Sequence, residues 1–227
     1  MKTLIVAASK LEIRPLLHYF DLDYKRSGEI QTIKRTDIEV DILVSGIGMV
    51  PTSYYLTKVL SHKKYDLVIN AGIAGSYVDS YPIGSVVQIV EDRFADCGID
   101  DNGKFVSLFE AGFMQPDEFP FVNSRLIPKI SKFDYICSRF SKAKAITVNT
   151  TSGSLARINE MVAKYKPDTE SMEGAAFFYV CISECVPCLQ IRAISNFVEP
   201  RCKQKWDITF AINTLNSNLI CIFELLR

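Results

Sequence analysis

The segment DTESMEG (residues 168–174) runs directly into the apolar segment AAFFYV (residues 175–180). An acidic turn followed by an apolar run predicts that a helix begins beside Glu173. Unpaired backbone N–H groups and the helix dipole at such a terminus favour an ionised carboxylate. A carboxylate held there can accept two hydrogen bonds from a vicinal diol, the pair of hydroxyls that a ribose presents. For an isolated glutamate, an ordinary charged first turn would be the better explanation, and only other features of the chain favour a binding role.

Outward from this segment, strand-like apolar runs alternate with helix-like segments, which favours an α/β layer architecture. We expect a single domain spanning residues 1–227, since the chain is long enough for one large core. The irregular stretch from Asp96 to Pro128 is interpreted as loops able to cover a pocket. The expected strands are 4–8, 30–35, 39–44, 66–70, 85–90, 143–148 and 188–194, and the expected helices are 12–20, 54–60, 155–165 and 208–226.

Composition excludes several classes of function. The 26 basic and 26 acidic residues cancel, and without a dense basic run we expect no nucleic-acid partner. The apolar start of the chain is too short for a signal peptide, and no other stretch is expected to span a membrane. Seven scattered cysteines suit a reducing cytoplasm, and the lone C-x-x-C at 185–188 is interpreted as packing rather than metal or redox chemistry.

Two glycine turns resemble nucleotide-binding loops without matching them. The turn at 45–48 lacks the third glycine of G-x-G-x-x-G, and the turn at 72–75 lacks the Lys-Ser/Thr of a P-loop. Small residues still allow a flat ligand to approach the backbone, and we assign this role to Ala71 and Gly72. For Gly46 and Gly48 a purely structural turn is about as plausible.

Three polar residues lie where ligands bind in α/β sheets, beyond the carboxyl ends of strands. Glu12 follows the first strand, Glu173 starts a helix, and Asn196 follows the strand at 188–194. Cleavage of an N-glycosidic bond requires a carboxylate to activate water, a group that holds the ribose hydroxyls, and a hydrogen-bond donor for the departing base. These three side chains would supply all three functions if they share one cavity.

Six segments occur in the order seen in the nucleoside phosphorylase and methylthioadenosine nucleosidase superfamily, so the chain resembles that superfamily along nearly its whole length. The resemblance implies a three-layer fold in which helices flank a central mixed, partly barrel-like sheet. Together with the long apolar helix around 54–60, the resemblance suggests a homodimer or larger assembly. We expect neither a metal nor a cofactor. The segments are residues 8–12, 45–48, 69–75, 151–153, 171–176 and 191–196.

Within this superfamily the sequence is most similar to the futalosine hydrolases, through residues 195–201 and 206–208. The resemblance implies that Glu12 activates water and that Met172 and Glu173 bind the ribose. Asn196 stands where enzymes that cleave 6-aminopurines usually carry an aspartate. Because an amide both donates and accepts, Asn196 favours a 6-oxopurine leaving group such as the hypoxanthine of futalosine.

Alternatives remain at this point. No arginine follows the turn at 72–75, where many phosphorylases bind phosphate, so water is the expected nucleophile. Arg201 is a candidate partner for the benzoate of futalosine. The residue that stacks on the base is unassigned. The other interpretations are a methylthioadenosine or adenosylhomocysteine nucleosidase, a purine nucleoside phosphorylase, and a nucleoside-binding protein without turnover.

Overall fold

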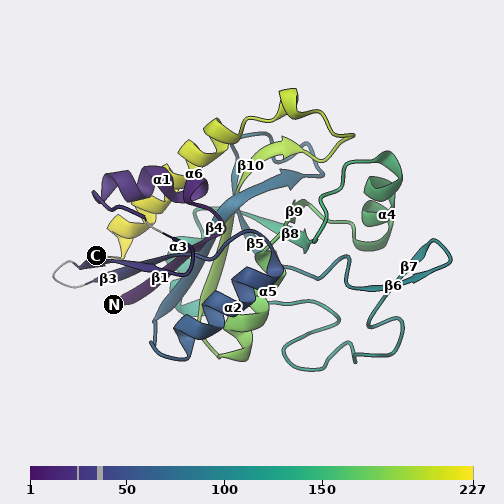
Figure 1. Cartoon of the computed structure of the whole chain (residues 1–227), viewed down its shortest axis with the longest axis horizontal. Helices are drawn as coiled ribbons and strands as arrows, with labels where there is room; N and C mark the ends of the chain where they lie inside the picture. Colours follow the sequence, from purple (N-terminus) through teal and green to yellow (C-terminus); the bar gives the residue numbers. More distant parts are fainter. Residues whose placement is uncertain (25, 35–37, 227) are drawn as a thin grey trace.

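The computed structural model describes residues 1–24, 26–34 and 38–226, and its centre is a mixed sheet of eight strands (Figure 1). The strands follow the order β10-β5-β8-β9-β4-β1-β3-β2, and β10 also pairs with β4. The sheet therefore closes on itself through β10, β5, β8, β9 and β4, while β1, β3 and β2 extend from it. Its strands are β1 (Lys2–Ala7), β2 (Ile30–Lys34), β3 (Glu39–Val44), β4 (Leu67–Ser76), β5 (Val86–Glu91), β8 (Ser141–Thr147), β9 (Thr169–Ser171) and β10 (Cys188–Phe197).

Helices cover both faces of this sheet, because its strands are apolar on both sides. On β4, Leu67 and Ile69 join the core beneath α1 (Lys10–Tyr19) and α6 (Ile208–Leu225), whereas Val68 joins the core beneath α2 (Met49–Leu60) and α5 (Gly174–Ser183). This alternation follows the two-residue period of a strand. Figure 1 shows the two helix pairs on opposite sides of the sheet. The expected three-layer fold with a partly closed sheet is confirmed.

The remaining elements lie around these layers. Helix α4 (Leu155–Tyr165) lies beside the end of the sheet formed by β8 and β9 (Figure 1). A separate hairpin, β6 (Gly98–Asp101) with β7 (Lys104–Ser107), interrupts the stretch that we expected to be irregular. Short helical turns occur at η1 (Ser131–Phe133), α3 (Asp134–Cys137) and η2 (Lys203–Lys205).

The sequence predictions were wrong about where two strands end. Strand β4 continues to Ser76 instead of turning after Asn70, because Gly72 and Gly75 are strand residues that leave room for side chains from β10. Strand β10 extends through Asn196 to Phe197. The predicted end of the second strand, Arg35, lies outside the described residues. All seven cysteines are free.

Helix α6 corrects a further expectation. Its 18 residues are long and apolar enough, by length and composition alone, to cross a membrane, although we expected no such stretch. In the structure its residues Ala211, Leu215, Leu219 and Ile222 are buried in the core shared with α1. Their spacing of three to four residues is that of a helix with one face against a sheet.

Candidate functional site

A cavity of about 350 Å³ lies at the carboxyl ends of β1, β4 and β10, a size typical of small-molecule sites. It brings together five of the seven residues singled out in the sequence: Glu12, Met172, Glu173, Asn196 and Arg201. These residues come from four separate parts of the chain. The rest of the described lining is Ala8, Ser9, Leu11, Ile47, Ile73, Ala74, Gly75, Thr151, Ser152, Gly153, Glu170, Ser171, Ser195, Phe197, Val198, Glu199, Trp206, Ile208 and Ile212.

Glu12 is held by its own helix terminus. Ser9 caps α1 and Glu12 is the third helical residue, which together form a capping box. Glu12 Oε2 accepts hydrogen bonds from the Ser9 backbone N–H (2.9 Å) and from Ser9 Oγ (3.0 Å). Glu12 Oε1 accepts from the backbone N–H of Ile73 in β4 (3.1 Å). Three donors therefore fix the orientation of a carboxylate that is only 7% exposed.

Glu173 occupies the N-cap of α5, as predicted, but its side chain does not cap that helix. Its Oε1 accepts from the backbone N–H of Gly48 (2.8 Å), and its Oε2 lies 3.8 Å from Nη1 of Arg192. Burial raises the pKa of Glu173, while the Arg192 guanidinium opposes the rise and the Glu12 carboxylate adds to it. The prediction that the start of α5 itself holds this carboxylate was wrong, because the carboxylate contacts Gly48 and Arg192 instead.

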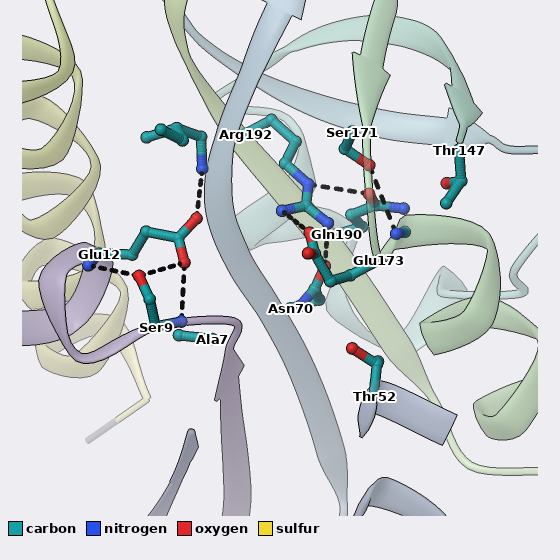
Figure 2. A network of polar contacts seen from close by, with 12 residues as sticks. Ala7, Ser9, Glu12, Thr52, Asn70, Thr147, Ser171, Glu173, Gln190 and Arg192 are labelled. Carbon is teal, nitrogen blue, oxygen red and sulfur yellow. Dashed lines mark hydrogen bonds and ion pairs between the residues drawn. The ribbon is translucent and has the colours of Figure 1, made fainter. Parts of the chain in front are cut away.

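Arg192 is almost fully buried and is fixed by two amide side chains (Figure 2). Its Nε donates to Oε1 of Gln190 (3.0 Å), and its Nη2 donates to Oδ1 of Asn70. Figure 2 shows these residues gathered with Glu173 in one group. Neither amide was predicted from the sequence to be part of the site. The available signal was the alternation of Gln190 and Arg192 in the otherwise apolar run 188–194, which places both side chains on one face.

Asp92 extends this network to the start of α5. Its Oδ2 accepts from Nε2 of Gln190 (3.2 Å) and its Oδ1 accepts from Oγ1 of Thr147 (3.0 Å). Thr147 Oγ1 in turn accepts from the backbone N–H of Ala175 in the first turn of α5 (2.7 Å). Burial raises the pKa of Asp92 to about 6, although these hydrogen bonds oppose the rise. Thr147, supported by Asp92, therefore supplies the capping contact that we expected from Glu173.

The residue after Glu173 is Gly174, and the space around it leaves no room for a side chain. A Cβ atom there would lie 2.2 Å from Oδ2 of Asp92 and 2.2 Å from Oε1 of Gln190, both of them buried groups. Any side chain at position 174 would therefore displace Asp92 and Gln190. The absence of a side chain therefore allows the polar network to pass directly beneath the start of α5.

Ala71 and Gly72 are not part of the described cavity lining. Ala71 is fully buried in the core beneath α1 and α6. A Cβ atom on Gly72 would lie 2.2 Å from Nη1 of Arg192 and 2.9 Å from Oε1 of Glu12. Gly72 thus provides space for two site residues rather than for a ligand, and it places Glu12 and Arg192 close to the same point of β4.

Asn196 is directed into the cavity by an irregularity in β10. The pairing of β10 with β4 shifts register between Ile194 and Asn196, which leaves Ser195 as an extra residue. Such bulges re-aim side chains and occur often beside active sites. Asn196 Oδ1 accepts from Oγ of Ser195 (2.8 Å), and its Nδ2 donates to the backbone oxygen of Phe197 (2.9 Å). One amide hydrogen is left for a ligand.

A further buried carboxylate in the cavity wall, Glu170, was not predicted from the sequence. Glu170 in β9 accepts hydrogen bonds from the backbone N–H of Ser152 (2.8 Å), from Ser152 Oγ (2.6 Å) and from the Tyr77 hydroxyl (2.7 Å). These contacts fix the loop at 151–153 against the cavity. The motif at 171–176 drew attention to Glu173, and no local pattern marked Glu170.

Arg201 lies at the exposed edge of the cavity. Its backbone N–H donates to the Gly153 oxygen (3.2 Å), and its guanidinium carbon lies 5.8 Å from the ring centroid of Trp206. Arg201 is the one basic side chain in the described lining. The arrangement places a cation and an indole ring side by side, a combination suited to an aromatic anion.

Comparisons with known proteins find similar sequences and similar folds. A futalosine hydrolase of Streptomyces coelicolor is 28% identical over 191 residues, which cover 81% of this chain and 78% of the relative. Native futalosine hydrolase of Helicobacter pylori superposes with a TM-score of 0.82 at 19% identity, covering 99% of this chain and 98% of that one. S-adenosylhomocysteine nucleosidase of Streptococcus pyogenes superposes with a TM-score of 0.82 at 20% identity, covering 100% and 98%.

These relatives are hydrolases and nucleosidases by name, which agrees with the expectation of an enzyme that hydrolyses an N-glycosidic bond. The phosphorylase superfamily model matches residues 2–227, almost the whole chain. The protein therefore belongs to the phosphorylase superfamily.

Proposed function

We propose that this protein hydrolyses the N-glycosidic bond of futalosine, releasing hypoxanthine and dehypoxanthine futalosine in menaquinone biosynthesis. The observation that carries the proposal is the convergence of Glu12, Glu173 and Asn196 on one small-molecule cavity. The similarity to a futalosine hydrolase over four-fifths of the chain supports the substrate class.

In the proposed reaction, Glu12 acts as the general base. It accepts a proton from water as the water oxygen forms a bond to the anomeric carbon of the ribose. The bond between that carbon and the purine nitrogen breaks, and its electron pair leaves with the purine, which then takes up a proton. Glu12 suits this role because three hydrogen-bond donors fix the orientation of its carboxylate. Gly72 leaves room for this carboxylate and for Nη1 of Arg192.

Glu173 and Met172 are the proposed ribose-binding residues. Glu173 has one strong backbone donor, Gly48, and retains acceptor sites for two sugar hydroxyls. Met172 is half-buried in the same wall, where its apolar side chain can support the sugar ring. Carboxylates at positions 12 and 173 also place negative charge beside a sugar that becomes cationic as the base departs.

Asn196 is the proposed reader of the base. An amide cannot serve as a general acid, so it favours a leaving group that departs well without full proton transfer. Its free amide hydrogen can donate to O6 or N7 of a 6-oxopurine. For the benzoate end of futalosine we propose Arg201, supported by its position beside Trp206.

The test is release of free purine, followed by chromatography, from futalosine, its 6-amino analogue and inosine, with and without phosphate. The proposal predicts phosphate-independent release of hypoxanthine from futalosine. Strict phosphate dependence would indicate a phosphorylase, preference for the 6-amino analogue would indicate a methylthioadenosine-type nucleosidase, and binding without release would indicate a nucleoside-binding protein.

Asn196→Asp tests the role of the amide. The variant should shift the ratio of kcat/KM toward the 6-amino analogue by about 10- to 100-fold, because a carboxyl group can protonate the leaving base. An unchanged ratio would remove Asn196 from base recognition.

We also propose a cytoplasmic homodimer or larger assembly. Helix α2 buries Leu56, Val59 and Leu60 but leaves Val50 and Tyr54 more than half exposed, so this face has apolar surface available for a second copy. The free state of all seven cysteines is compatible with a reducing compartment. Light scattering that gives the mass of a monomer would contradict the assembly.

A further inference from the structure

Helix α1, which carries Glu12, lacks one of its own hydrogen bonds just after that residue. Pro15 lies inside the helix and has no backbone N–H, so it cannot donate to the oxygen of Leu11. The next bond of a regular helix would join the N–H of Leu16 to the oxygen of Glu12. Both of these groups contact a side chain from another helix, that of Asn216 in α6. The turn of α1 that carries Glu12 is therefore held partly by α6.

Asn216 uses its whole amide for this contact. Its Oδ1 accepts from the Leu16 N–H (3.0 Å), and its Nδ2 donates to the backbone oxygens of Glu12 (2.7 Å) and Ile212 (2.7 Å). Because a backbone N–H only donates and a carbonyl only accepts, these contacts fix which way the amide points. Asn216 is 1% exposed and is the one buried polar residue of α6, all of which the structure describes. Such burial of an asparagine is unusual without hydrogen bonds of this kind.

The beginning of α6 is fixed at the opposite end of the cavity. The backbone N–H of Asp207, the N-cap of α6, donates to the oxygen of Ser195 (2.9 Å). Ser195 is the extra residue of β10 that directs Asn196 into the cavity. Helix α6 thus runs from the strand end that carries Asn196 to the turn that carries Glu12, and Asn216 is the residue that joins it to that turn.

We propose that Asn216 is a positioning residue for Glu12, and that it holds the general base at a fixed distance from the purine end of the cavity. The capping box orients the carboxylate within α1, whereas Asn216 fixes this turn of α1 relative to α6 and β10. Asn216 is not part of the described cavity lining, so it acts through Glu12 and not on the substrate. The proposal rests on the proposed function, because it takes Glu12 as the general base.

Asn216→Leu tests this proposal, because it removes the bridge without leaving a buried polar group unpaired. The Leu16 N–H and the Glu12 oxygen can then bond to each other, as in a regular helix. We expect kcat for hypoxanthine release from futalosine to fall by about 10- to 100-fold, since a shift of about 1 Å in a reacting group has an effect of this size. KM should change by less than about threefold, because the substrate-binding residues are untouched. A kcat equal to that of the wild type would overturn the proposal.

Leu219→Ala is the matched control. Leu219 is 1% exposed and packs in the same core one turn further along α6, but its side chain has no group that could bridge α1. Its truncation should lower the free energy of unfolding, while kcat should stay within about threefold of the wild type. An equal fall of kcat in Leu219→Ala and Asn216→Leu would mean that any loosening of α6 impairs turnover, which contradicts a specific role for the amide.

A double variant separates action through Glu12 from a general loss of structure. In the Glu12→Gln background, Asn216→Leu should lower kcat by less than about threefold, because the group that it positions is already missing. Losses that multiply in the double variant would count against the proposal.

Asn216→Ala serves if the leucine variant does not fold, because it removes the bridge without adding volume to the core. The same fall of kcat at nearly constant KM is expected, and wild-type turnover would again reject the positioning role. Failure of the proposed function appears separately, as no release of hypoxanthine from futalosine by the wild-type protein. The variants are then compared on whichever nucleoside of the panel the wild type cleaves.

Discussion

The starts of α1 and α5 each place a glutamate in the cavity, but they hold it by opposite means. Glu12 is fixed by Ser9, three residues away in the same turn, and by one strand N–H. Glu173 is held by Gly48, 125 residues away, and faces Arg192 from a different strand. Glu12 is therefore oriented mainly by local structure, whereas Glu173 depends on the assembled fold.

This difference has an energetic consequence. Two of the three donors around Glu12, the backbone N–H and the hydroxyl of Ser9, are in place as soon as α1 forms. The environment of Glu173 forms only when β10, α2 and α5 meet, and its burial raises the pKa of the carboxylate. The burial of Glu173 therefore opposes its ionisation, and changes there should affect stability as well as activity.

The largest effect is expected for Glu12→Gln. Removal of the general base should lower kcat by roughly 10²- to 10⁴-fold while leaving substrate affinity close to that of the wild type. Single-turnover kinetics and equilibrium binding measure the two quantities separately. Near-normal turnover would mean that Glu12 is only a capping-box residue of α1. The general base would then have to be another residue.

Glu173→Gln should separate activity from stability. Loss of charge-assisted hydrogen bonds to the ribose should weaken kcat/KM by about 10- to 100-fold. Because the folded-state pKa of Glu173 is raised, its ionisation costs stability as the pH rises through that value. The variant should therefore gain free energy of unfolding relative to the wild type above about pH 4.5, the usual glutamate range.

Denaturant unfolding at several pH values measures this gain. The matched control is Glu199→Gln, measured over the same range, because Glu199 also lines the cavity but pairs with Lys205. If the difference in free energy between Glu173→Gln and the wild type does not change with pH, the environment of Glu173 is not the desolvated one described here.

Gly174→Ala should disturb the network beneath α5. Its Cβ atom would overlap Asp92 and Gln190, and such overpacking costs about 1–3 kcal/mol of unfolding free energy. Gly153→Ala is the control, because a Cβ atom there would meet only Cβ of Arg201, at 3.6 Å. Equal unfolding free energies of the two variants in denaturant would show that the network accommodates the extra methyl group without loss of stability.

The smallest effect is expected for Ser9→Ala. It removes the cap of α1 and one hydrogen bond to Glu12, which should cost about 1 kcal/mol of stability. Turnover should fall less than in Glu12→Gln, because the N–H groups of Ser9 and Ile73 still hold the carboxylate. A loss of activity as large as that of Glu12→Gln would mean that the local hydroxyl, and not the strand, orients the base.

The same difference between local and long-range contacts explains what could be predicted from the sequence. Periodic apolar runs and the motifs around Glu12, Glu173 and Asn196 were sufficient for the layers of the fold and for most of the candidate site. The contacts of Asn70, Asp92, Glu170 and Gln190 were not predictable, because each depends on which strands become neighbours when the sheet closes. Ala71 and Gly72 were assigned to ligand binding because small residues allow another group to approach the backbone closely. Their size does not indicate whether that group is a ligand or a side chain of the protein.

The central claim is tested most directly by the structure of the Glu12→Gln variant with intact futalosine bound. We predict ribose hydroxyls within hydrogen-bond distance of the Glu173 carboxylate, the purine edge against Asn196, and a water molecule between residue 12 and the anomeric carbon. A nucleoside bound outside this cavity, or with its sugar away from Glu173, would contradict the account.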